Sequence, residues 1–243
     1  QTPTLIALDA DGQPLRPALI WMDRRAEEEV RQLSDGIGAG EIFRISGNRP
    51  DAYYLAAKLL WFRRHEPDLF ARTHQFVQIT GYINYRLTGA YTLDSAHAAL
   101  LQLREYGSDQ WSPILCAGCG VDPSQLPPVF PGYEVQGEVT EAAAVATGLR
   151  AGTPVMVGTV DGAAAALEAG VTAVGIAAEM TGTSTVVIMP NIGGATAPAL
   201  ISMPHALPDV NLLLGAMVAT GASLSWYRDQ FGLVERQAAG LLD

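Results

Sequence analysis

The central third of the chain shows the clearest pattern of apolar and polar positions. A β-rich apolar run from Val155 to Val160 ends at one carboxylate, Asp161, and a helix of small residues is expected from Gly162 to Ala169. A second apolar run is interrupted at Thr181-Gly182-Thr183-Ser184 and then resumes. The pattern predicts a strand, an acid, a helix and two strands joined by a tight turn.

The same reasoning predicts the elements on either side. A helix should follow Trp21-Met22-Asp23-Arg24-Arg25, where arginines pair with nearby glutamates on an ordinary surface. The other predicted elements are a hairpin over Thr4–Ile20, a helix within Gly47–His65, a strand and helix over Phe76–Leu87, a helix capped by Asp94-Ser95, a helix over Thr140–Gly148, a β pair over His205–Gly215 and a helix over Thr220–Phe231.

Composition narrows the class of protein. The 243 residues are 49% hydrophobic and 16% charged, which fits one large or two small domains with an ample core. The net charge of −10 argues against a nucleic-acid partner, although a nucleotide held by backbone amides stays compatible. The longest apolar run, Leu212 to Leu224, is too short and glycine-interrupted to span a membrane. We expect a cytoplasmic, soluble chain without a membrane partner.

Two features that resemble reactive or metal sites are interpreted as structural. Cys116 and Cys119 form a C-x-x-C in an amphipathic helix that ends at Gly120, without a second cysteine pair to complete a zinc site. His97 has no His, Cys or acid at ligand spacing, so we interpret it as a satisfied core or surface histidine.

Asp161 is the strongest candidate for chemistry. Phosphoryl transfer to an alcohol needs a carboxylate that takes the hydroxyl proton, and an Asp beside a Gly at a strand end can face a cleft. The alternative is a helix N-cap, for which Asp is also favoured. Tyr53 and Tyr54, at the opening of the helix after Asp51, either face a cleft or pack in the core.

The turn Gly182-Thr183-Ser184 could wrap phosphate oxygens with its amides and hydroxyls, or be a plain hairpin turn. It is not a G-K-[ST] phosphate loop, and neither G-x-G-x-x-G nor G-x-S-x-G occurs. Gly221 and Ser225, at the opening of a helix, would suit an adenine or ribose packed against backbone.

Short segments spread over nearly the whole chain, taken in order, resemble the FGGY family of carbohydrate kinases, and most of all its xylulokinase-type members. These segments are WMDRR (21–25), GN and KLLW (47–48, 58–61), HEPDLF (65–70), ITGYINYRLTG (79–89), DQW and LPPV (109–111, 126–129), VGTVDGAA (157–164), GTST (182–185), HALP (205–208) and TGASLSW (220–226).

The resemblance implies an α/β fold of two actin-like, ribonuclease-H-like domains, of which this chain covers a part. Residues 1–171 would be the rest of the N-terminal sugar domain, and 172–243 the start of the nucleotide domain. It puts Asp161 on the catalytic base, with Tyr53 and Gly162 in the substrate site. Gly182, Thr183 and Ser184 would touch ATP phosphates, and Gly221 and Ser225 would line the nucleotide. ATP and Mg²⁺ are the expected cofactors.

Two departures from the family pattern qualify this interpretation. Gly162 stands where xylulokinases usually carry Asn and glycerol kinases carry Gln, so a polar substrate contact is missing. The family's Asp-x-Gly-Thr hairpin, the sugar-contacting segment before WMDRR and the Gly-rich adenosine motif are absent. We therefore expect an internal segment that is inactive by itself.

The sequence thus predicts that the parent protein phosphorylates a sugar hydroxyl with ATP, the sugar being a ketopentose such as xylulose, and that it could form a homodimer. The alternatives are a glycerol or polyol kinase of the same family, a non-catalytic sugar-binding regulatory module, and an actin-like structural ATPase. Tyr53 and Asp161-Gly162 argue against the ATPase, because a filament protein needs no sugar pocket.

Overall fold

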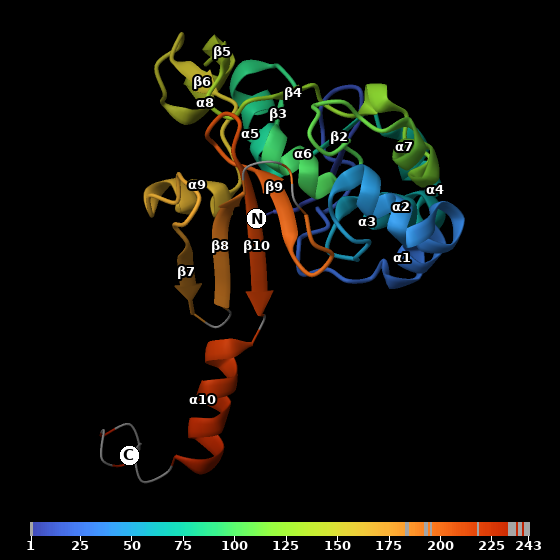
Figure 1. Ribbon diagram of the computed structural model, residues 1–243. Helices are drawn as coiled ribbons and strands as arrows, with labels where there is room; N and C mark the ends of the chain where they lie inside the picture. Colours follow the sequence, from blue (N-terminus) through green and yellow to red (C-terminus); the bar gives the residue numbers. More distant parts are fainter. Residues whose placement is uncertain are drawn as a thin grey trace.

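The computed structural model describes residues 2–182, 185–191, 194, 196–217, 219–232, 237 and 240 (Figure 1). Helices and short strands alternate until the last third of the chain, where longer strands follow one another. The helices are α1 Glu27–Leu33, α2 Ala39–Ser46, α3 Leu55–His65, α4 Pro67–Arg72, α5 Ile79–Thr88, α6 Ser95–Leu101, α7 Pro113–Cys119, α8 Glu141–Thr147, α9 Asp161–Glu168 and α10 Thr220–Phe231. The strands are β1 Ile6–Leu8, β2 Gln75–Val77, β3 Leu93–Asp94, β4 Val129–Phe130, β5 Val135–Glu138, β6 Pro154–Met156, β7 Ala178–Thr181, β8 Thr185–Asn191, β9 Ile201–Pro204 and β10 Asn211–Met217.

The largest sheet has the strand order β7-β8-β10-β9, and each neighbouring pair is antiparallel. Ile188 of β8 lies opposite Leu214 of β10, so both side chains, together with that of Leu212, point to one face. Helix α9 covers this face, because its fully buried Ala163 and Ala166 share a core with Ile188 and Leu212. Alanine side chains let the helix lie close to the strands.

A second core lies among α1, α3, α7 and the β1–β2 pair. Phe62 of α3 packs edge-on against Phe76 of β2, with ring centroids 6.3 Å apart. Helix α7 contributes Cys116 and Cys119 to this core, both as free thiols. Burial raises the pKa of the Cys116 thiol to about 11. The helix ends at Gly120 with a φ of 70°, which confirms the structural interpretation of this C-x-x-C.

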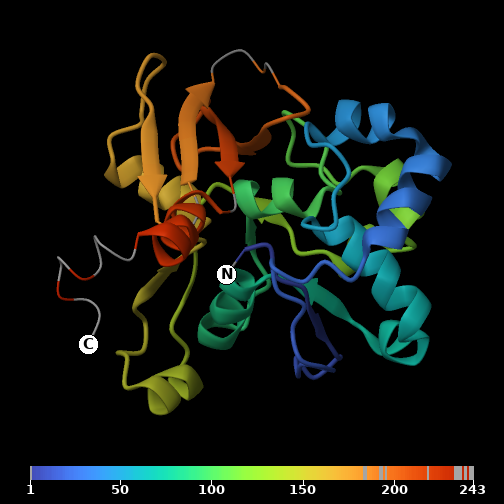
Figure 2. The ribbon, with the colours of Figure 1, turned by 90° about the horizontal axis from the view of Figure 1, so that it is seen from below.

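Helix α6 lies between the two cores. Its Ala96, Ala99 and Leu100 belong to the core under the sheet. Its Ala98 and Leu101 belong to the helical core. Figures 1 and 2 show α6 in green between the orange strands and the blue helices. The helix is therefore surrounded by protein, and the polar side chains at its start need partners inside the protein.

Several predicted elements have the expected bounds. The acid is followed by a small-residue helix, α9, and the apolar runs around Gly182 form an antiparallel pair, β7 and β8. Thr140 caps α8 through its side chain, and Gly148 ends that helix with a positive φ of 77°. Helix α10 spans the predicted Thr220–Phe231. These elements depend on local signals, which the sequence carries in full.

Two expectations about strands were wrong. The strand predicted over Val155–Val160 is only β6 and ends at Met156, because Gly158 takes a φ of 81°, which strands do not use. The β pair predicted over His205–Gly215 begins earlier than expected, because its first strand, β9, spans Ile201–Pro204 and ends before His205. The predicted hairpin over 4–20 is confirmed by antiparallel bridges from Leu5 to Leu19 and from Leu8 to Pro14, and β1 also pairs with the distant β2.

One buried asparagine joins the helical part to the edge of the large sheet. The side-chain amide of Asn48 donates to the carbonyl of Ser202 at 2.9 Å, and its Oδ1 accepts from the Ser202 amide at 2.8 Å. Tyr54 donates its hydroxyl to the same Oδ1 at 3.1 Å. Asn48 thus occupies the position that a further strand would have beside β9, and it satisfies an edge that would otherwise be buried without partners.

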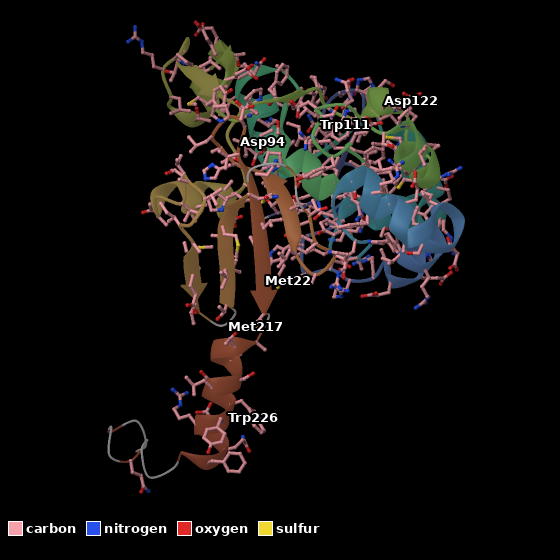
Figure 3. All side chains as sticks on the ribbon, viewed as in Figure 1. Met22, Asp94, Trp111, Asp122, Met217 and Trp226 are labelled. Atoms are coloured by element: carbon pink, nitrogen blue, oxygen red, sulfur yellow. The ribbon has the colours of Figure 1, made fainter. Side chains whose placement is uncertain are left out.

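Helix α10 projects away from the sheet (Figure 1). Its large apolar side chains, Leu224, Trp226, Tyr227 and Phe231, are exposed. Trp226 is 59% exposed and lies far from Asp94, at the centre of the molecule, in Figure 3. No helix in the described part of the chain is both long and apolar enough to cross a bilayer.

We predict that Asn48→Ala in the full-length natural protein speeds amide hydrogen exchange at Ser202 roughly tenfold to hundredfold, because a buried amide loses its acceptor. Hydrogen exchange with mass spectrometry would measure this. Gln32→Ala is the control, because Gln32 bonds only Glu28 on an exposed helix surface and should leave Ser202 unchanged. Equal exchange rates in the two variants would refute the role given to Asn48.

Candidate active site

Asp161 is the first residue of α9 and is solvent-exposed. The residue at the N-cap is Val160, so the alternative interpretation of Asp161 as the N-cap is wrong. Its Oδ1 accepts a hydrogen bond from the amide of Gly162 at 2.8 Å. A negative charge in the first turn also interacts favourably with the helix dipole. The carboxylate is therefore oriented by its own helix and remains open to an incoming hydroxyl.

Gly162 lies directly over the large sheet. A Cβ added there would approach Met203 Cε to 3.3 Å and Leu214 Cδ1 to 3.9 Å. A larger residue would fit only if the flexible Met203 side chain moved. Gly162 therefore offers backbone, and no side chain, to whatever lies in front of Asp161.

Tyr53 lies just before α3, and the negative charge of Asp161 acts on its phenol. Burial, and then the negative charge of Asp161, raise the pKa of Tyr53, so the phenol stays protonated. The hydroxyl donates to the carbonyl of Thr2 at 3.2 Å, and the Tyr53 amide donates to Asp51 Oδ1 at 2.8 Å. Tyr53 also packs against the core that contains Val160 and Ala163, which lie on either side of Asp161 and Gly162 in the chain.

Lys58 is a buried cation that the sequence analysis missed. Its Nζ donates to the carbonyl of Ile20 at 2.8 Å and to that of Tyr53 at 3.2 Å. Burial lowers the pKa of Lys58 to about 8, although Asp23 and Asp51 raise it in part. Lys58 therefore ties the segment before α1 to Tyr53. A single Lys within the apolar run of α3 was the available signal.

The segment that carries Trp21 reaches the same region. Trp21 is 42% exposed and Met22 is 60% exposed. Arg24 pairs with Glu27 at 2.6 Å, which confirms the expected arginine–glutamate pairing, and with Asp51 at 2.9 Å. Asp51 is the residue that holds the Tyr53 amide, so the 21–25 segment and Tyr53 share one polar anchor.

Gly182 lies in the turn between β7 and β8, exposed and with open space where a Cβ would be. The hydroxyls of Thr181 and Thr185, on either side of the turn, are 3.0 Å apart. Thr183 and Ser184, the other predicted phosphate contacts, lie outside the described residues. A backbone this open can be approached closely by a ligand.

Gly221 and Ser225 lie one turn apart on α10, Gly221 half-buried and Ser225 exposed. Helix α10 begins just after β10, whose Met217 pairs with Thr185 beside the Gly182 turn. The candidate nucleotide residues therefore gather at one end of the sheet. Gly162 lies near Leu214, three residues from Met217, or roughly 10 Å along the strand.

The described residues contain no group of three or more His, Cys, Asp or Glu side chains arranged to hold a metal. Asp161 would be a lone carboxylate ligand. Mg²⁺ typically keeps several waters and takes one or two carboxylates together with substrate phosphates. This part of the chain therefore provides no dedicated protein cage for the metal.

Known proteins resemble this chain in sequence and in fold. The FGGY family of carbohydrate kinases, N-terminal domain, matches residues 1–168. The chain is 31% identical over 228 residues to the xylulose kinase of Escherichia coli (strain K12), covering 93% of this chain and 46% of that protein. It is 30% identical over 240 residues to the autoinducer-2 kinase of Klebsiella pneumoniae subsp. pneumoniae, covering 97% of this chain and 45% of that protein.

The solved structures agree with this result. The xylulose kinase from Rhodospirillum rubrum superimposes with a TM-score of 0.94 at 31% identity, covering 99% of this chain and 50% of that one. The chain thus spans about half the length of the relatives it matches. The actin-like two-domain fold predicted from the sequence, partly covered by this chain, is confirmed. On the match over residues 1–168, this chain belongs to the FGGY family of carbohydrate kinases.

Proposed function

We propose that the full-length protein is a kinase that transfers the γ-phosphoryl group of ATP to a hydroxyl of a ketopentose such as xylulose. The observation that carries this proposal is the exposed carboxylate of Asp161 at the start of α9, with the half-buried Tyr53 packed against the core that holds Val160 and Ala163. Family membership supplies the reaction class. The relatives of the chain include xylulose and autoinducer-2 kinases, which favours a sugar-like acceptor.

In this proposal Asp161 acts as general base. Its carboxylate takes the proton of the sugar hydroxyl while that oxygen forms a bond to the γ-phosphorus and the bond to the departing ADP breaks. Charge is conserved, because the proton moves to Asp161 and the leaving ADP carries the negative charge. The Gly162 amide, which bonds Oδ1, keeps the carboxylate oriented while it waits for substrate.

Tyr53, Asp161 and Gly162 would line the acceptor site, and Tyr53 would present an uncharged ring edge and hydroxyl to a polyol. The lack of a polar side chain at Gly162 supports a sugar bound through fewer side-chain contacts at that position. The acceptor residues belong to the proposed sugar domain, 1–171.

ATP would bind at the far end of the sheet, in the proposed nucleotide domain that starts at residue 172. The open turn at Gly182, with Thr183 and Ser184, would receive the phosphates, and Gly221 and Ser225 would line the nucleoside. The position of both groups at one end of the sheet supports this assignment. Mg²⁺ would arrive with the triphosphate and offset its charge.

The first test removes the base. Asp161→Asn in the full-length protein should lower sugar-dependent ADP formation by about 10² or more, because a general base typically contributes that much. A coupled ADP assay over a panel of pentuloses and polyols would measure it. Glu168→Gln, an exposed acid at the other end of the same helix, is the control and should keep the parent rate. Near-parent activity of Asp161→Asn would remove Asp161 from this role.

The second test concerns the acceptor site. Tyr53→Phe removes the hydroxyl that bonds the Thr2 carbonyl, and we expect the KM for the sugar to rise roughly two- to tenfold while the KM for ATP stays the same. Tyr133→Phe is the matched control, because Tyr133 is 51% exposed. An unchanged KM for the sugar, or an equal change in both KM values, would contradict the assignment of Tyr53.

A further inference from the structure

Two ionisable side chains are fully buried at the start of α6. Asp94 is 2% exposed and His97 is 1% exposed. The Asp94 Oδ2 pairs with His97 Nδ1, and Asp94 Oδ1 accepts from the backbone amides of Ala96 and His97, each at 3.1 Å. Burial of an acid this deep is costly unless hydrogen bonds compensate, and these bonds do so.

The first connection from this pair leads to Tyr53. His97 Nε2 lies 2.8 Å from the hydroxyl of Thr2. Nδ1 carries a proton because it faces a carboxylate, and Nε2 also lies 3.5 Å from the Thr80 hydroxyl. The carbonyl of Thr2 in turn accepts from the Tyr53 hydroxyl at 3.2 Å. One buried chain of hydrogen bonds thus runs from Asp94 to Tyr53.

The second connection leads to the segment before Asp161. The hydroxyl of Thr159 donates to Asp94 Oδ1 at 3.3 Å. Thr159 lies two residues before Asp161, in the loop that replaced the predicted strand. Among the residues that the structure describes, no strand pairs with 159 and 160, so the bond to Asp94 holds the loop just before α9.

The arrangement of an acid, a histidine and a hydroxyl resembles a nucleophilic triad, but its burial argues against that use. Thr2 is only 9% exposed, and His97 and Asp94 are buried more deeply, so a substrate could not reach the Thr2 hydroxyl. The pair is closed off from solvent, and it contacts Thr2 and Thr80 through His97 and Thr159 through Asp94.

We propose that Asp94 and His97 form a positioning pair for the acceptor site, holding Tyr53 through Thr2 and Asp161 through Thr159. This inference rests on the proposed function, since it gives the pair a role in that same site. The two connections end on residues with different roles. Loss of the Thr2 connection should therefore weaken sugar binding, and loss of the Thr159 connection should slow the chemical step.

The test compares two threonines in the full-length protein. Thr2→Val should raise the KM for the preferred sugar of the panel roughly two- to tenfold with kcat nearly unchanged. Thr159→Val should lower kcat by a similar factor with the KM nearly unchanged. Thr2→Ser and Thr159→Ser keep the hydroxyls and should restore the parent values, which a loss of packing alone would not predict.

Thr73→Val is the matched control. Thr73 is also buried, and its hydroxyl bonds only the carbonyl of Leu69 at 2.9 Å within the α4 region. It should lower the midpoint of thermal unfolding as much as the other valine variants while leaving kcat and KM unchanged. His97→Asn, which can keep the Asp94 contact but not the Thr2 contact, should reproduce Thr2→Val and add nothing to it. If His97→Asn does not fold, the comparison of the valine and serine variants at Thr2 and at Thr159 tests the proposal.

The outcomes separate the two hypotheses. If the unmodified protein forms no ADP with any sugar of the panel, the proposed function fails, and this inference fails with it. If the unmodified protein is active but Thr2→Val and Thr159→Val match Thr73→Val, or change kcat and KM together, the positioning pair alone is refuted. A higher KM alone in Thr2→Val and a lower kcat alone in Thr159→Val, each absent from the serine variant, support it.

Discussion

The burial of α6 between two hydrophobic cores is the constraint on which the rest of the structure depends. One side of the helix serves the core under the large sheet and another serves the helical core. A helix in that position cannot leave polar groups to water, so Asp94 and His97 must be satisfied by protein. Their partners come from segments that are distant in the sequence, Thr2 and Thr159. Burial of this helix therefore determines where both segments lie.

The two parts of the molecule are also joined by polar groups that replace missing backbone partners. Asn48 completes the edge of β9 through Ser202, and Lys58 satisfies the carbonyls of Ile20 and Tyr53. Each bonds two groups at once, so its removal would leave more than one buried group unpaired. Lys58 thereby holds the backbone of Tyr53, while Asp161 stays exposed.

The candidate site is divided along the sheet. Gly162, the neighbour of Asp161, lies beside the middle of β10, whereas Gly182 and Gly221 lie at the end of the hairpin and the start of α10. An acceptor alcohol beside Asp161 and a triphosphate at the Gly182 turn would fit this division, because the reacting phosphorus must lie between the alcohol and the rest of the nucleotide. In the proposed kinase both substrate sites lie against the same sheet, which would hold the two substrates in line for the reaction.

The sequence by itself determined the elements that depend on neighbouring residues. Thr140 and Gly148 bound α8, Gly120 ends α7, and the small residues after Asp161 form α9, because caps and turns involve atoms only a few residues apart. The ordered motifs also identified the family. Only the tertiary structure decided that β1 pairs with β2, that Asn48 meets Ser202, and that His97 links Asp94 to Thr2. Those partners are up to 154 positions apart, and no local pattern specifies which buried group will face which across a packed core.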